Sequence, residues 1–92
     1  MQVNKPIVID VREPSEFAES HFDGAINIPS GDFEDGKALS KLGGDHKGPE
    51  IILYCRTGVR AGRCLDILMQ RGFSNVTNGI NQQTVIESLR EN

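Results

Sequence analysis

Short apolar runs that alternate with helix-like segments constrain the fold of this 92-residue chain more than any other feature. The apolar runs are rich in β-branched residues, as buried strands are. They cover residues 6–11, 25–29, 51–54 and 76–77. The helix-like segments cover residues 14–20, 30–42, 61–69 and 80–89. Because strands and helices that alternate over short connections favour a parallel sheet, we predict an α/β fold of about four to five parallel strands with helices on both faces.

The two C-terminal helical segments carry apolar residues at helical spacing, which predicts the side chains that face the core. In the segment 61–69 these are Ala61, Cys64, Leu65, Leu68 and Met69. In the segment 80–89 they are Val85, Ile86 and Leu89. Glycine and proline at 43–49 predict a loop before the third strand.

Length and cysteine content restrict the class of protein. The chain is long enough to bury a core of its own, so we expect residues 1–92 to form a single domain. Cys55 and Cys64 are too few for a disulfide framework or a zinc site, and His21 and His46 stand at no ligand-like spacing. We therefore expect neither a metal nor a cofactor.

The net charge of −3 hides an uneven distribution of charged residues. Residues 10–35 hold eight acidic residues and one basic residue, whereas residues 55–63 hold three arginines and no acid. Arginines gathered around one cysteine predict a local site for an anion. A nucleic-acid-binding face would need a broad basic surface, so we expect no nucleic-acid partner.

The hydropathy of the chain bears on where it works. No apolar run approaches the length of a membrane span, and Met1–Lys5 is polar rather than signal-like. We therefore expect no membrane partner and a cytoplasmic location. A periplasmic location stays open if a signal peptide has been removed.

The residue with the clearest chemistry is Cys55, which ends an apolar strand just before a helix begins. Free N–H groups and the positive end of the dipole at a helix N-terminus stabilise an anion. An ordinary thiol with a pKa near ~8.5 is only about 3% thiolate at neutral pH, and lowering its pKa by about two units makes it mostly thiolate. Cys55 is therefore a candidate nucleophile, and the carboxyl end of a parallel strand is where such sheets place their sites.

Four segments of the chain resemble the signatures of the rhodanese-like (sulfurtransferase) domain family, in the right order and over nearly the whole length. They are Asp10–Phe17 (DVREPSEF), His21–Pro29 (HFDGAINIP), Tyr54–Ala61 (YCRTGVRA) and Gly72–Gly79 (GFSNVTNG). The small, single-domain bacterial type is the nearest in pattern. The resemblance agrees with the α/β fold predicted from the alternation of elements.

The resemblance implies a double-displacement transfer of sulfur. Cys55 would take the outer sulfur of a small anionic donor such as thiosulfate, and the resulting persulfide would pass it to cyanide, a thiol or another protein. The backbone N–H groups that follow the cysteine would cradle the persulfide. By position these belong to Arg56, Thr57, Gly58, Val59 and Arg60.

Three features depart from the family pattern. Tandem-domain thiosulfate sulfurtransferases usually carry a lysine where this chain has Thr57, and a positive charge follows instead at Arg60. The chain begins at what is usually the second strand, so one edge strand is missing or is supplied differently. The segment 81–84 holds no tryptophan, which many relatives have there. The first departure leaves the physiological donor open.

Other charged and reactive residues are expected to have structural or weaker roles. Arg60 is the best candidate for a substrate-binding arginine; Arg56 is equally well a solvated charge, and Arg63 is expected to be a solvated helix residue. Cys64 is expected in the core, because it lies on the apolar stripe of its helix, with a resolving or relay thiol as the alternative.

Three further residues are expected to support the fold around the site. Asp10 and Arg12 are predicted to form hydrogen bonds and ion pairs beneath the active-site loop. His21 is predicted to fix a turn. No general base is evident near Cys55, and none is needed if the loop itself stabilises the thiolate.

Two other functions remain as alternatives. Tyrosine-type phosphatases and some arsenate reductases use a cysteine in a related loop, but the phosphatase pattern needs an arginine after five intervening residues. Counting from Cys55, that position holds Ala61, so the loop is one residue short for a phosphate cradle. The second alternative is a non-catalytic rhodanese-like interaction module, although such modules commonly lose the cysteine.

Overall fold

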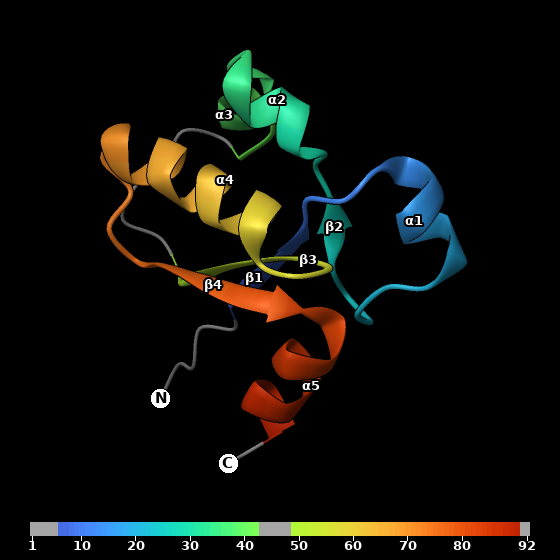
Figure 1. The fold of residues 1–92 in the computed structure, drawn as a ribbon. Helices are drawn as coiled ribbons and strands as arrows, with labels where there is room; N and C mark the ends of the chain where they lie inside the picture. Colours follow the sequence, from blue (N-terminus) through green and yellow to red (C-terminus); the bar gives the residue numbers. More distant parts are fainter. Residues whose placement is uncertain (1–5, 43–48, 91–92) are drawn as a thin grey trace.

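The computed structural model describes residues 6–42 and 49–90, so most of the loop predicted at 43–49 lies outside the described residues. Strands and helices alternate along the chain (Figure 1). They are β1 (Ile7–Asp10), α1 (Pro14–Glu19), β2 (Ile26–Asn27), α2 (Ser30–Glu34), α3 (Lys37–Leu42), β3 (Ile51–Cys55), α4 (Val59–Gln70), β4 (Val76–Asn81) and α5 (Gln82–Arg90).

The four strands form one sheet in the order β2-β1-β3-β4, and every neighbouring pair is parallel. The predicted α/β fold is confirmed, with four strands in the described residues. β3 occupies a central position and is buried along its whole length, which explains its unbroken apolar sequence. Its C-terminal residue, Cys55, therefore lies at the carboxyl edge of a parallel sheet.

Side chains that alternate along β3 divide the core into two layers. Ile51, Leu53 and Cys55 belong to a cluster that includes buried residues of α2, α3 and α4. Ile52 and Tyr54 belong to a second cluster with Val85 of α5, packed against Phe17 of α1. Figure 1 shows α2, α3 and α4 on one side of the sheet and α5 on the other. Cys55 thus points toward the α4 layer.

The boundary between β4 and α5 differs from the prediction of a strand at 76–77 and a helix from residue 80. β4 runs to Asn81, and α5 begins at Gln82. The register with β3 slips at this point, because Tyr54 pairs with Ile80 while Leu53 pairs with Asn78. Gly79 is the extra residue, and a Cβ there would lie 2.7 Å from Val85 Cγ2, so only glycine lets α5 pack this closely.

The apolar stripes of α4 and α5 are narrower than their sequence periodicity predicted. Cys64, Leu68 and Val85 are buried as expected. Met69 and Leu89 are 53% and 38% exposed, so the prediction that they face the core is wrong. Both lie near the C-terminal end of their helix. No helix within 6–42 and 49–90 has the length and apolar character needed to cross a membrane.

Candidate active site

The thiol of Cys55 lies in a turn that joins the end of β3 to the start of α4. The residue is 2% exposed, and its sulfur accepts hydrogen bonds from two backbone N–H groups. Gly58 N is 3.1 Å and Ala61 N is 3.4 Å from Cys55 Sγ. The first donor belongs to the set predicted from the sequence, and the second lies one residue beyond it. The turn therefore wraps the sulfur with donors from two sides.

These donors determine the acidity of the thiol. Burial raises the pKa of Cys55, but the backbone N–H groups of Ala61, Thr57, Gly58 and Arg60 lower it by more, so the net pKa lies below the ordinary thiol value. A sulfur atom at the N-terminus of a helix is a favourable place for negative charge. The site therefore favours the thiolate, the nucleophilic form of cysteine.

The turn depends on an unusual backbone conformation at Gly58. This residue is the N-cap of α4 and has a φ of 94°, in the left-handed region that glycine enters without steric cost. Its carbonyl oxygen accepts a hydrogen bond of 3.0 Å from Asn78 Nδ2, and Asn78 Oδ1 accepts one of 2.9 Å from Ile80 N. Asn78 thus fastens the turn to β4, a role that no local sequence signal indicates.

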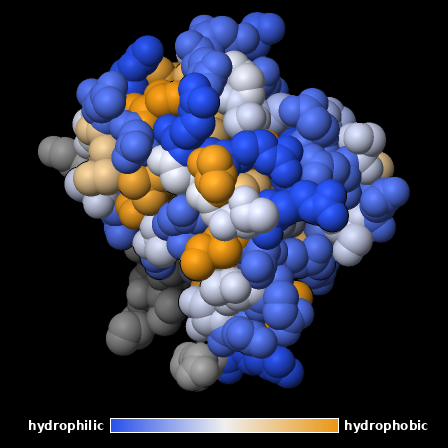
Figure 2. All heavy atoms as spheres, viewed as in Figure 1, coloured by the Kyte–Doolittle hydropathy of each residue, from blue (hydrophilic) through white to orange (hydrophobic). Residues whose placement is uncertain are grey.

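The rim of the site carries exposed apolar side chains as well as charges. Val59 is 69% exposed at the start of α4, and Ile80 is 42% exposed near the end of β4. Figure 2 shows scattered hydrophobic spheres among hydrophilic ones on the face of the molecule seen in Figure 1. Ile80 also has a φ of 73°, which is rare for a β-branched residue. Its Cγ2 would be 3.4 Å from a Cβ at Gly58, so Ile80 packs against the turn.

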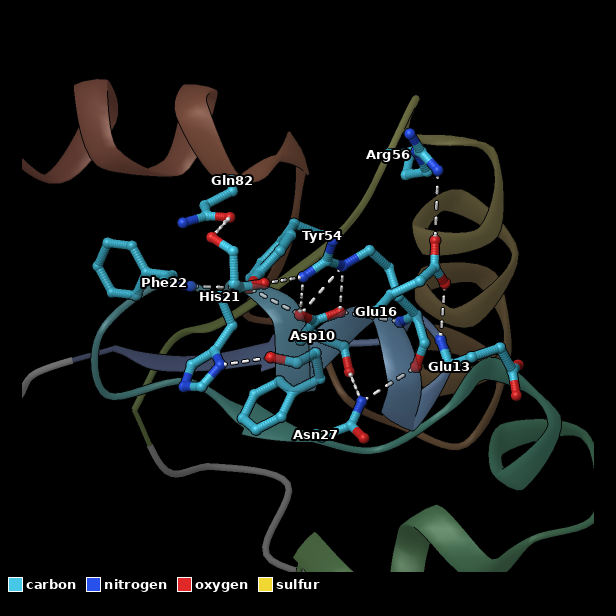
Figure 3. Close-up of polar contacts among 12 residues, drawn as sticks. Asp10, Glu13, Glu16, His21, Phe22, Asn27, Tyr54, Arg56 and Gln82 are labelled. Atoms are coloured by element: carbon cyan, nitrogen blue, oxygen red, sulfur yellow. Dashed lines mark hydrogen bonds and ion pairs between the residues drawn. The ribbon is translucent and has the colours of Figure 1, made fainter.

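The two arginines closest to the turn both contact Glu16, in the first turn of α1. Arg60 forms a two-pronged contact, with Nη1 2.9 Å from Glu16 Oε1 and Nη2 3.3 Å from Glu16 Oε2. Arg56 Nη1 lies 3.8 Å from Glu16 Oε2 and is largely exposed (Figure 3). The hydrogen bond from Arg60, aided by one from the Glu13 backbone, lowers the pKa of Glu16 to about 2. Sequence reasoning missed Glu16.

Arg63 offers a useful contrast with Arg60. Its Nη2 lies 2.7 Å from Glu34 Oε2, and both side chains are mostly exposed. The expectation of a solvated helix residue fits this position. Exposed pairs of this kind contribute little to stability.

Beneath the turn, the carboxylate of Asp10 is fully buried and satisfied by hydrogen bonds (Figure 3). Arg12 donates to it from its backbone N at 2.9 Å, from Nε at 2.9 Å and from Nη2 at 2.7 Å. The hydroxyl of Tyr54 donates to Asp10 Oδ2 at 2.8 Å. The hydrogen bonds and ion pair predicted for Asp10 and Arg12 are therefore present, and Tyr54 joins them from β3.

This buried group links several segments. Burial, with a smaller effect from the Asp10 carboxylate, raises the pKa of Tyr54 to about 12, so the phenol stays a donor. Its oxygen accepts from Phe22 N at 3.0 Å, and Arg12 Nη2 donates to Ser20 O at 2.6 Å. Asn27 Nδ2 donates to the carbonyls of Asp10 and Arg12. Tyr54, the residue before Cys55, is thus anchored to β1 and to the segment after α1, and Asn27 ties β2 to the same group.

Cys64 and His21 both make contacts that support the fold. Cys64 is 1% exposed in the cluster that also holds Cys55, and burial raises its pKa to about 12. Both cysteines are free thiols. His21 Nδ1 lies 2.7 Å from Phe17 O, and its ring stacks on that of Phe17 with centroids 3.6 Å apart. Within the described ranges, no three metal-ligating side chains gather in one place.

Comparison with known proteins decides the family. A model of the rhodanese-like domain matches residues 1–81. The chain belongs to the rhodanese-like family. This rhodanese-like chain is also similar to a solved rhodanese with anions from Escherichia coli, with a TM-score of 0.75, 28% identity, and coverage of 87% of this chain and 91% of that one.

Two curated relatives extend the comparison. The probable adenylyltransferase/sulfurtransferase MoeZ of Mycobacterium tuberculosis is 39% identical over 74 residues, which are 80% of this chain and 18% of MoeZ. The thiosulfate sulfurtransferase PspE of Escherichia coli is 33% identical over 70 residues, which are 76% of this chain and 64% of PspE. The rhodanese-like chain therefore spans less than two thirds of either relative.

Proposed function

We propose that this protein is a sulfurtransferase that carries sulfane sulfur as a persulfide on Cys55. The observation that supports it most is the position of Cys55 Sγ, 3.1 Å from Gly58 N and 3.4 Å from Ala61 N. Donors in this arrangement stabilise negative charge on the cysteine, and they can stabilise it equally on a second sulfur. Family membership and relatives named as sulfurtransferases support the same function.

The reaction proceeds in two displacements. The Cys55 thiolate attacks the outer sulfur of thiosulfate, a sulfur–sulfur bond forms to Cys55, and the bond within thiosulfate breaks so that sulfite leaves with the electron pair. A nucleophilic acceptor then attacks the terminal sulfur of the persulfide. The bond to Cys55 breaks, and its thiolate is regenerated. No net proton or electron is required from the protein.

The turn is proposed to bind both the donor and the persulfide. Backbone N–H groups of residues 56–60 would hold the terminal sulfur, with Ala61 N completing the set. The guanidinium groups of Arg56 and Arg60 would attract the anionic donor in competition with Glu16, which contacts both. The buried ion pair of Asp10 and Arg12 would act indirectly, by holding the end of β3 in place.

The donor and the acceptor are proposed by chemical class. The donor is a small anion with a sulfane sulfur, for which thiosulfate is the model because PspE is named a thiosulfate sulfurtransferase. The acceptor is a thiol or a protein in the cell and cyanide in the assay. The phosphatase alternative lacks comparable support, because the position that would need its arginine holds the buried Ala61.

Mass spectrometry of the intact protein tests the proposal. After incubation with thiosulfate, the wild type is expected to gain the mass of one sulfur atom, which cyanide then removes. Cys55→Ser should gain nothing, and Cys64→Ala, the matched control, should gain the same mass as the wild type. A wild type that takes up no sulfur but hydrolyses p-nitrophenyl phosphate would overturn the proposal and favour the phosphatase.

A further inference from the structure

Arg56 and Arg60, the positively charged side chains at the mouth of the Cys55 site, are both paired with Glu16. Arg60 is held by both oxygens of Glu16, at 2.9 and 3.3 Å, and Arg56 approaches the same carboxylate at 3.8 Å. A guanidinium that already has a bidentate carboxylate partner binds a second anion much more weakly than a free guanidinium does. The arginines that the sequence singles out for an anion are therefore engaged within the protein.

We propose that Glu16 is a specificity-determining residue that closes Arg60 against small free anions. An anionic donor gains the guanidinium only by displacing the carboxylate. The inference rests on the proposed function and deepens it, because it makes Glu16 the residue that limits how strongly the site binds a small anionic donor such as thiosulfate. A donor that brings cationic or neutral contacts of its own to the mouth is limited less.

The balance of charges supports this assignment. The charged groups around Arg60 are Arg56 and the acidic groups Glu16, Glu13 and, when ionised, Cys55. The negative charge of Cys55 is among the causes that raise the pKa of Arg60, so these groups interact across the site. Removing the charge of Glu16 would make the mouth more positive by one unit charge. Glu16 therefore weakens the attraction of the mouth for an anion.

The structural role of Glu16 can be separated from its charge. Its Oε1 also accepts a hydrogen bond of 2.9 Å from Glu13 N and so caps the start of α1. A glutamine keeps this acceptor and loses only the charge. Glu16→Gln is thus expected to leave α1 in place and to free Arg60.

Alkylation of Cys55 measures the effect of charge without depending on sulfur transfer. Iodoacetate and iodoacetamide react with the same sulfur, and only the first is an anion. The rates at Cys55 are followed by peptide mapping, and their ratio (anion over neutral reagent) is compared between proteins. Removing the negative charge that pairs with Arg60 should raise this ratio about fivefold in Glu16→Gln, and added salt should reduce the rise.

Glu19→Gln is the matched control. Glu19 lies at the other end of α1 and makes no ion pair with any residue in the described ranges. The Glu19→Gln variant removes the same formal charge away from Arg60. Its ratio of alkylation rates should therefore stay at the wild-type value. A ratio in Glu16→Gln equal to that of the wild type, or an equal rise in Glu19→Gln, would overturn the proposal.

The thiosulfate reaction then extends the test to the donor. Glu16→Gln should lower the KM for thiosulfate about fivefold with little change in kcat, since the ground-state attraction is what changes. If the alkylation ratio rises but neither the wild type nor Glu16→Gln takes up sulfur, Glu16 acts on anions as proposed and the proposed sulfurtransferase function is wrong. If sulfur is taken up and neither the ratio nor KM changes, the function stands and the assignment of Glu16 is wrong.

Discussion

Cys55 and Cys64 lie nine positions apart in the same buried cluster, yet the pKa of Cys55 is lowered and that of Cys64 is raised. Burial raises the pKa of both. At Cys55 the backbone N–H groups of the turn lower it below the ordinary value, whereas at Cys64, inside α4, burial prevails and the pKa is about 12. Burial alone therefore does not decide whether a cysteine is reactive. The direction of nearby N–H groups decides it.

The contrast between the two cysteines would be wrong if Cys64 were as important for activity as Cys55. We expect Cys55→Ser to lower kcat/KM for thiosulfate roughly a thousandfold or more, because the nucleophile is lost. Cys64→Ala should change it less than about twofold and cost about 1 kcal/mol of unfolding free energy, since only a small buried group is removed. Steady-state kinetics and urea unfolding measure both effects. A comparable loss of activity in Cys64→Ala would restore the relay role for Cys64.

Alkylation of the native protein with iodoacetamide at neutral pH compares the reactivity of the two thiols directly. Only the thiolate reacts, so we expect Cys55 to be modified at least about a hundredfold faster than Cys64. Peptide mapping by mass spectrometry gives the two rates. In urea, where the fold is lost, the two cysteines should react at similar rates. Equal rates in the native state would contradict the assigned acidities.

The role of the turn can be tested at Gly58. A Cβ at a φ of 94° is strained and would lie 3.4 Å from Ile80 Cγ2, so Gly58→Ala should shift the N–H that points at Cys55. We expect an activity loss of about thirtyfold, somewhat less than a dedicated oxyanion donor contributes, and a stability loss of about 1 kcal/mol. Gly36→Ala, at a φ of 88° with open space around it, is the matched control for strain alone. Equal activity in both variants would deny Gly58 its role.

The smallest expected effect compares two arginines that each pair with a glutamate. Arg60→Ala should raise the KM for thiosulfate about tenfold, because it removes a cation and leaves Glu16 with only its looser contact to Arg56. Arg63→Ala should leave KM within about twofold, since its pair with Glu34 is exposed. Steady-state kinetics at fixed ionic strength measures both. Equal effects would contradict the assignment of Arg60 to donor binding.

Local sequence patterns were enough to predict most of the fold and the position of Cys55 at the end of a strand, before a helix. Alternating strands and helices imply a parallel sheet, and a cysteine at a strand end before a helix must lie near free N–H groups. Gly58 was also visible, because such a turn needs a residue that tolerates a positive φ. These features depend on neighbours in sequence.

The remaining parts of the site depend on contacts between distant segments. Glu16 meets Arg60 across 44 positions, and Asn78 meets Gly58 across 20. Neither contact leaves a local pattern, because each joins side chains or backbone of elements that lie far apart in the sequence. The bulge at Gly79 was missed for a related reason, since glycine there serves the close approach of α5 rather than a turn.

The central claim is that the turn after β3 lowers the pKa of the Cys55 thiol. Its most direct test is a pH titration of thiolate ultraviolet absorbance in the Cys64→Ala variant, in which Cys55 is the remaining cysteine. The account predicts a midpoint clearly below the value measured for the same protein unfolded in urea. A native midpoint equal to or above the unfolded one would contradict it.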